Sequence, residues 1–99
     1  MRRRERSLSF AADSPFLAGH FPGNPVVPAV VILAELIDWT ESEVGRTVVG
    51  VDSSRFRKPL KPNEAWSVAL EEHSTQSVRI VARDGDRVVM QARLSLESG

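Results

Sequence analysis

The chain has 99 residues, with 13 basic and 13 acidic side chains and no formal net charge. This length fits one domain, 1–99, with one modest hydrophobic core, and the balanced charge gives no reason to expect a nucleic-acid partner. Cysteine is absent, which excludes disulfides, thiolate catalysis and cysteine-bound metal. The apolar run 26–34 is far too short to span a membrane, and no early apolar stretch resembles a signal peptide. We therefore expect a cytoplasmic protein without metal or cofactor.

The N-terminal segment begins with a basic end, 1–6, that we expect to be solvated and flexible. Leu8 and Phe10 then alternate with polar residues, and this period of two predicts a half-buried strand over 7–12. Asp13-Ser14-Pro15 ends the strand.

A loop rich in proline and glycine follows, and it contains a single histidine, His20. Three prolines and two glycines lie within residues 19–28. Each proline fixes φ and each glycine permits conformations closed to other residues, so the loop is expected to hold the histidine in place.

A helix is predicted from about Pro28 to Val44. Proline suits the first turn of a helix, and Gly45 suits its C-terminal cap. The first half of the helix is apolar all round, which predicts that it is buried on every side and, in a chain this short, that a sheet must wrap it. Glu35, Asp38 and Ser42 form the polar stripe of its second half.

The remainder of the chain is typical of strands joined by turns, with no second helix. Residues 47–51 are rich in β-branched side chains, 54–60 are extended, and alternating patterns follow at 66–71, 78–82 and 88–96. Turns are expected at Pro62-Asn63 and Asp84-Gly85-Asp86. The predicted fold class is α+β, with a curled antiparallel sheet around one central helix.

Two segments resemble a known family. His20-Phe21-Pro22-Gly23-Asn24-Pro25-Val26-Val27-Pro28 is similar to the His-Phe-Pro-Gly-x-Pro-x-x-Pro-Gly signature of the β-hydroxyacyl-acyl carrier protein dehydratases, with Ala29 in place of the last glycine. Arg55-Phe56-Arg57-Lys58-Pro59-Leu60-Lys61-Pro62-Asn63-Glu64 resembles the family's Arg-Phe-x-x-Pro-Val-x-Pro-Gly-Asp segment. Asn63 replaces a glycine there, and asparagine tolerates the left-handed backbone that such a turn requires. The resemblance covers about residues 8–96 and implies the hot-dog fold.

The resemblance implies a hydro-lyase that dehydrates 3-hydroxyacyl thioesters in fatty acid or polyketide-type metabolism. His20 would be the base that removes the C2 proton, and the Ala29 N–H at the start of the helix would bind the thioester carbonyl. The expected substrate-binding residues are Phe21, Gly23, Pro28, Ala29, Val30 and Ala34.

The acid departs from the family pattern. The family carries Glu or Asp fourteen residues after the histidine, where this chain has Ala34. Glu35 is the next residue but lies about 100° around the helix. Asp38 lies one turn further on the face of Ala34, and helical side chains lean back toward the N-terminus. Glu35 and Asp38 are both candidates, and a solvated helix face without catalytic role is the alternative.

The expected partners follow from the same resemblance. The acyl group would arrive on acyl carrier protein or coenzyme A. Arg55, Arg57, Lys58 and Lys61 would form a basic rim for the acidic carrier, and a solvated edge without a partner is the alternative. The family forms dimers in which the histidine of one subunit works with the carboxylate of the other, so a homodimer or a heterodimer with another hot-dog chain is expected. The alternative functions are a non-catalytic or half-site acyl-binding subunit and an acyl thioesterase. His73 is expected to be a surface residue.

Overall fold

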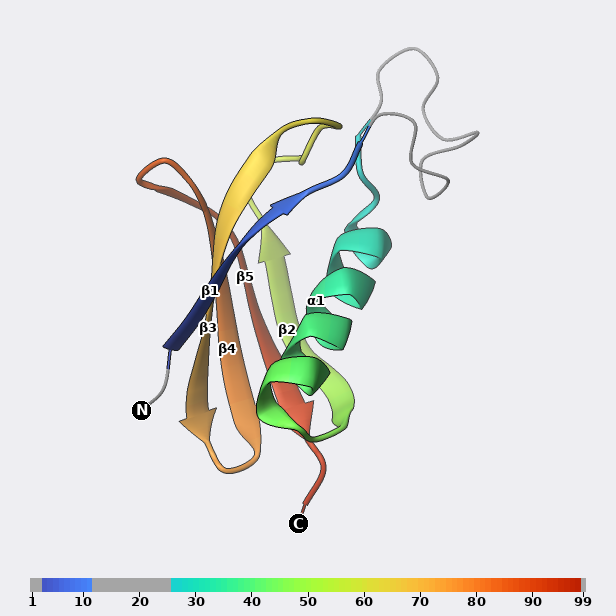
Figure 1. Ribbon diagram of the computed structural model, residues 1–99, viewed down its shortest axis with the longest axis vertical. Coiled ribbons are helices and arrows are strands. Elements are labelled where there is room, and N and C mark those ends of the chain that lie inside the picture. Colours follow the sequence, from blue (N-terminus) through green and yellow to red (C-terminus); the bar gives the residue numbers. More distant parts are fainter. Residues whose placement is uncertain (1–2, 12–25, 99) are drawn as a thin grey trace.

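The computed structural model describes residues 3–11 and 26–98. This part of the chain contains α1 (Ala29–Val44) and the strands β1 (Arg3–Ser9), β2 (Val48–Phe56), β3 (Ala65–Ser74), β4 (Ser77–Asp84) and β5 (Arg87–Leu96). The strands form one sheet in the order β1-β3-β4-β5-β2, and every neighbouring pair is antiparallel. Figure 1 shows the sheet curling, with α1 running along one side of it. This is the predicted α+β arrangement of one helix and a curled sheet.

The inner face of the sheet and the facing side of α1 form the hydrophobic core. The inward positions predicted for β3 are confirmed, because Trp66, Val68 and Leu70 are all buried, but Ala69 on the opposite face is buried as well. Ile32 and Leu36 of α1 pack into the same cluster. Burial of such apolar surface is the main free-energy term that holds the helix against the sheet.

The helix begins and ends close to the predicted positions. Pro28 is the residue just before α1, and Gly45 caps the other end in the left-handed conformation with φ 70°. The Gly45 N–H donates to the carbonyl of Glu41 at 2.9 Å. A residue with a Cβ would be strained at this φ, so the glycine is the reason that the helix ends here.

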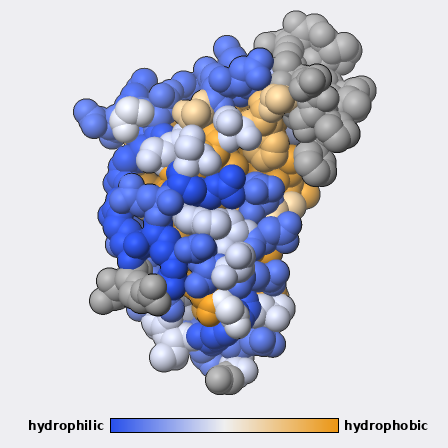
Figure 2. Space-filling view, viewed as in Figure 1, coloured by the Kyte–Doolittle hydropathy of each residue, from blue (hydrophilic) through white to orange (hydrophobic). Residues whose placement is uncertain are grey.

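The prediction that the first half of the helix is buried on every side is wrong for the single chain. The sheet covers the side that carries Ile32, Leu36 and Thr40, whereas Val30 is 71% exposed and Ala34 is exposed. Five strands curl far enough to cover one side of a helix only. In Figure 2, hydrophobic residues remain visible beside the grey segment, where α1 begins. The open side of the helix is therefore partly apolar.

The first strand starts at Arg3, earlier than the Ser7 expected from hydrophobic alternation. Residues 3–9 pair with 65–71 of β3, and Arg4 and Arg6 occupy the alternate positions that continue the series of Leu8. Their long stems suit half-buried positions while their charged heads reach carboxylates of α1. A pattern of apolar residues alone does not detect such a strand end.

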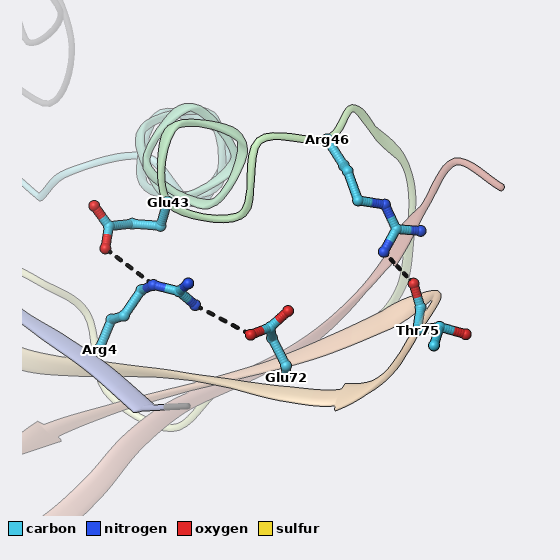
Figure 3. Close-up of polar contacts among 5 residues, drawn as sticks. All are labelled: Arg4, Glu43, Arg46, Glu72 and Thr75. Carbon is cyan, nitrogen blue, oxygen red and sulfur yellow. Dashed lines mark hydrogen bonds and ion pairs between the residues drawn. The ribbon is translucent and has the colours of Figure 1, made fainter. Parts of the chain in front are cut away.

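Ion pairs fasten this end of β1 to its neighbours (Figure 3). Arg4 lies 3.2 Å from Glu43 of α1 and 3.4 Å from Glu72 of β3, and its side chain is only 14% exposed. At the end of the helix, Arg46 donates to the carbonyl oxygens of Thr75 and Glu97. These contacts fix the helix relative to the sheet far from its N-terminal end.

The last strand departs from the predicted alternation at its start. Met90, Ala92, Leu94 and Leu96 are buried as expected, but Val89 is also buried while Val88 is only half-buried. The register of β4 and β5 shifts between Ala82 and Arg83. Such an irregularity inserts one extra residue and reverses the alternation beyond it.

Among the described residues, no helix has the length and hydropathy needed to cross a membrane.

Candidate functional site

The predicted base lies outside the described residues. His20, Phe21 and Gly23 all belong to the segment 12–25, and the description of the chain resumes at Val26. The other predicted site residues can be placed. They lie on α1 or just before it, on β2, and on the connection between β2 and β3.

At the start of α1, one backbone carbonyl accepts hydrogen bonds from the helix, and no side chain of the described residues caps it. The carbonyl of Pro28 accepts hydrogen bonds from the N–H groups of Val31 and Ile32 at 3.0 and 3.2 Å. Within residues 3–11 and 26–98, no side chain caps the helix, and Ala29 is exposed. The first N–H groups of a helix lack partners within it and lie at the positive end of its dipole. This end can therefore bind a partial negative charge such as a carbonyl oxygen.

The second of the two predicted segments runs beside the helix start. Val27 donates its N–H to the carbonyl of Leu60 at 2.8 Å, and Asn63 donates its N–H to the carbonyl of Phe10 at 2.8 Å. Asn63 has φ 65°, which confirms the left-handed turn expected at this position. The two backbone contacts bring residues 55–64 against the ends of β1 and α1.

A mainly apolar hollow of about 390 Å³, the helix-start groove, lies between these segments. It is lined by Val26, Val27, Pro28, Ala29, Ile32, Phe56, Arg57, Lys58, Pro59 and Leu60. The N-terminal end of α1 and two cations of the connection that follows β2, Arg57 and Lys58, line this groove. An apolar chain with a polar group near Ala29 fits this lining.

A second hollow of about 250 Å³, the helix-face groove, lies on the open side of α1. It is lined by Phe10, Val30, Val31, Ala34, Glu35 and Asp38. Ala34 and Asp38 are exposed, on the side of the helix opposite the buried Ile32 and Leu36. The groove thus brings together the position of the missing acid and both candidates for its replacement.

The two candidate acids differ in their contacts. Glu35 accepts a hydrogen bond from the Arg6 guanidinium at 3.1 Å, and Arg6 also lies 5.8 Å from the centroid of the Trp39 ring. Asp38 forms no ion pair with any residue that the structure describes. Glu35 is therefore held toward β1, whereas Asp38 lies in the groove without a charged partner.

The predicted basic rim separates into different surroundings. Arg55 is exposed on β2 opposite Gln91 of β5, and Lys61 is exposed on the connection to β3. Arg57 and Lys58 instead line a hollow of about 570 Å³, the basic hollow. Its lining is Arg57, Lys58, Asp84, Arg87, Val88 and Val89.

Two of the residues that line the basic hollow form an ion pair. Lys58 Nζ lies 2.5 Å from Asp84 Oδ2, and the hydrogen bond to Asp84 raises the pKa of Lys58 above its ordinary value of 10.5. Arg87 was not identified from the sequence. The sequence predicts the turn at 84–86, but it does not reveal the strand pairing that brings the residue after this turn close to the end of β2.

His73 is exposed on β3, as expected.

Comparison with known proteins gives a consistent result. The model of the ApeI-like family, described as ApeI dehydratase, matches residues 2–93. The 3-hydroxyacyl-[acyl-carrier-protein] dehydratase FabZ of Caulobacter sp. (strain K31) is 33% identical over 84% of this chain and 60% of its own length. The FabZ of Desulfotalea psychrophila is 35% identical over 83% of this chain and 65% of its own length. The chain thus spans about three fifths of the length of the first curated relatives that it matches.

Solved structures agree with the fold. The dehydratase heterocomplex ApeI:P of Xenorhabdus doucetiae contains a chain that matches with a TM-score of 0.84 and 16% identity, over 97% of this chain and 88% of that one. An uncharacterized protein of Erwinia carotovora matches with a TM-score of 0.79 and 22% identity, over 96% of this chain and 82% of that one. The hot-dog fold expected from the resemblance is confirmed.

Proposed function

We propose that this chain, which belongs to the ApeI-like dehydratase family, removes water from a 3-hydroxyacyl thioester. The observation that carries the proposal is the helix-face groove, in which a carboxylate, Asp38, lies on the open side of a helix whose first N–H groups no described side chain caps. An elimination of this kind needs a base, an acid and a group that stabilises the enolate-like charge on the thioester.

His20 supplies the base in this proposal. A neutral imidazole takes the C2 proton, and the electron pair of the broken C–H bond forms the new double bond while the C3–O bond breaks. The Ala29 N–H binds the thioester oxygen as negative charge develops there, with the helix dipole adding to the effect. Asp38 is the general acid that gives a proton to the departing hydroxyl, which leaves as water.

Asp38 is proposed as the acid in preference to Glu35. The carboxylate of Glu35 already accepts from Arg6 at 3.1 Å, so proton donation by Glu35 requires that it first give up this contact. Asp38 shares the exposed face of Ala34, and its side chain lines the groove. Side chains of a helix lean toward its N-terminus, so the Asp38 carboxyl reaches into the space that the small Ala34 side chain leaves open.

A second hot-dog subunit is proposed to complete the site. β2 is an edge strand of the sheet, and Val49 and Val51 on it are 62% and 42% exposed. Val30 on the open side of α1 is 71% exposed. An edge with unpaired backbone groups and exposed valines favours pairing with another strand. Such an assembly covers the open side of the helix and lets His20 of one subunit work with Asp38 of the other.

The substrate is proposed to be carried on acyl carrier protein or coenzyme A. Both present the acyl group on a pantetheine thiol, and the helix-start groove offers an apolar lining that ends at Ala29. Arg55, Arg57, Lys58 and Lys61 lie on or near the same connection and give it a positive charge toward an acidic carrier.

The experiment that tests this proposal follows two products in one sample. Purified protein is incubated with a 3-hydroxyacyl thioester, and the absorbance of the enoyl thioester and the release of free thiol are recorded together. Dehydration predicts enoyl product without free thiol. Free thiol without enoyl product would instead identify a thioesterase. No product from this chain alone, and enoyl product after a second hot-dog chain is added, would identify a half-site subunit.

A further inference from the structure

We propose that the basic hollow binds the phosphate of a pantetheine thioester, with Arg57 and Arg87 as its ligands. This inference rests on the proposed function, and it assigns a role to Arg87, which neither family segment contains. Phosphate is the group that acyl carrier protein and coenzyme A share at the end of the pantetheine arm.

The fold brings the two arginines together from separate parts of the chain. Arg57 follows β2, and its N–H donates to the carbonyl of Val89 on β5 at 2.8 Å. Arg87 opens β5 opposite Asp84, the last residue of β4. The backbone contact therefore fixes the residue after β2 beside the turn between β4 and β5. Both side chains line the same hollow of about 570 Å³.

The charges in the hollow favour an anion. The carboxylate that lines the hollow belongs to Asp84, and it forms an ion pair with Lys58 at 2.5 Å. Its negative charge is therefore compensated by Lys58. Arg57 and Arg87 form no ion pair within residues 3–11 and 26–98, and both are exposed. A guanidinium presents two parallel N–H donors, which match two oxygens of a phosphate. The pair of arginines thus offers both charge and donors for one phosphate group.

The position of the hollow indicates what the phosphate is attached to. Arg57 and Lys58 line both the basic hollow and the helix-start groove, so the two spaces share a wall. A ligand that lies across both has an anionic end at the arginines and an apolar or thioester end near Ala29. A phosphorylated pantetheine arm with an acyl group has this order of groups.

Direct binding tests the phosphate site without need of turnover. The probes are an S-alkyl pantetheine thioether and the same thioether with a 4′-phosphate, and their Kd values are measured by calorimetry at low ionic strength. The phosphorylated probe is expected to bind more tightly. In the Arg57→Gln/Arg87→Gln variant this advantage falls by about tenfold, the size expected for two exposed charge contacts.

A matched control removes two positive charges elsewhere. Arg79 and Arg93 lie opposite each other on β4 and β5, both are exposed, and neither lines the basic hollow. The Arg79→Gln/Arg93→Gln variant is expected to keep the advantage of the phosphorylated probe. An equal loss in this control would show that net charge alone attracts the probe, and it would overturn the proposed site.

The outcomes also separate this inference from the proposed function. Equal Kd values for the two probes in the wild type overturn the phosphate site and leave the pantetheine groove in place. Absence of binding by either probe contradicts both.

Two further probes carry the same thioether on coenzyme A and on a carrier protein. A lower Kd for one of them identifies the source of the phosphate. In either case, the advantage over the unphosphorylated probe must fall by about tenfold in the Arg57→Gln/Arg87→Gln variant, and an unchanged advantage there overturns the assignment.

Discussion

Arg6 on β1 donates to the carboxylate of Glu35 on α1 at 3.1 Å, and the same guanidinium lies over the ring of Trp39, one helical turn further on. One cation thereby holds two residues on the same flank of the helix, which stabilises the contact between β1 and α1. The consequence for the site is a division of roles between two neighbouring acids. Glu35 is engaged with the sheet, and Asp38 remains in the helix-face groove.

Substitution of the two acids separates these roles. Asp38→Asn is expected to lower kcat/KM for dehydration by about 100-fold or more, because a general acid contributes that much to such a step. Glu35→Gln is expected to lower the free energy of unfolding slightly and kcat/KM by less than about threefold, since an exposed ion pair contributes up to about 1 kcal/mol. Steady-state kinetics with the enoyl absorbance measures both. A larger loss in Glu35→Gln than in Asp38→Asn would reverse the assignment.

The Arg4 ion pairs are expected to stabilise the fold. Arg4→Met removes a guanidinium that is 14% exposed and lies between Glu43 and Glu72, and we expect the free energy of unfolding to fall by about 1 to 2 kcal/mol. Arg3→Met is the control, because Arg3 and Glu5 are 49% and 59% exposed and their pair contributes little. Urea unfolding of both variants measures the difference. Equal midpoints for the two variants would contradict the expectation.

The proposed assembly through β2 is tested by a charge on the edge strand. Val51→Lys is expected to raise the dissociation constant of the dimer at least about tenfold, because lysine at an edge opposes strand pairing and would be buried without a partner. Sedimentation velocity over a range of concentrations measures the dissociation constant. Ser67→Lys, at an exposed position of the interior strand β3, is the control and should leave assembly unchanged. An unchanged dimer in Val51→Lys would place the interface elsewhere.

The Lys58 ammonium offers a prediction about pH. The hydrogen bond to Asp84 raises the pKa of Lys58 above 10.5, so the paired ammonium stabilises the folded state below that pH. This contribution is lost as the pH rises through the folded-state pKa. Asp84→Asn is expected to bring the pKa of Lys58 back toward 10.5. Titration of the Lys58 side chain by NMR measures the change, and an unaltered pKa would show that Asp84 does not hold the ammonium in solution.

Several features of the fold could be predicted because they depend on local chemistry. Gly45 ends the helix and Asn63 adopts the left-handed turn, since few residues tolerate positive φ. The buried alternation of Trp66, Val68 and Leu70 follows from the period of a strand that faces a core on one side.

Other features depend on contacts between distant segments, and the sequence does not reveal them. Arg4 and Arg6 belong to a strand because they pair with β3, and their charged heads reach carboxylates of α1. Val30 is exposed because five strands cover only one side of the helix, although the apolar pattern predicted full burial. Arg87 lines the basic hollow because the residues that follow β2 lie beside β5, and this pairing of distant strands has no local signal.

Turnover of a 3-hydroxyacyl thioester by the wild type and by His20→Ala tests the central claim most directly. We predict that the wild type forms the enoyl thioester, and that His20→Ala loses about 100-fold or more of kcat/KM while its circular dichroism spectrum and Tm stay unchanged. Wild-type activity that persists in His20→Ala would contradict the assignment of the base. A wild type that forms no enoyl thioester, alone or with a second hot-dog chain, would contradict the dehydratase function itself.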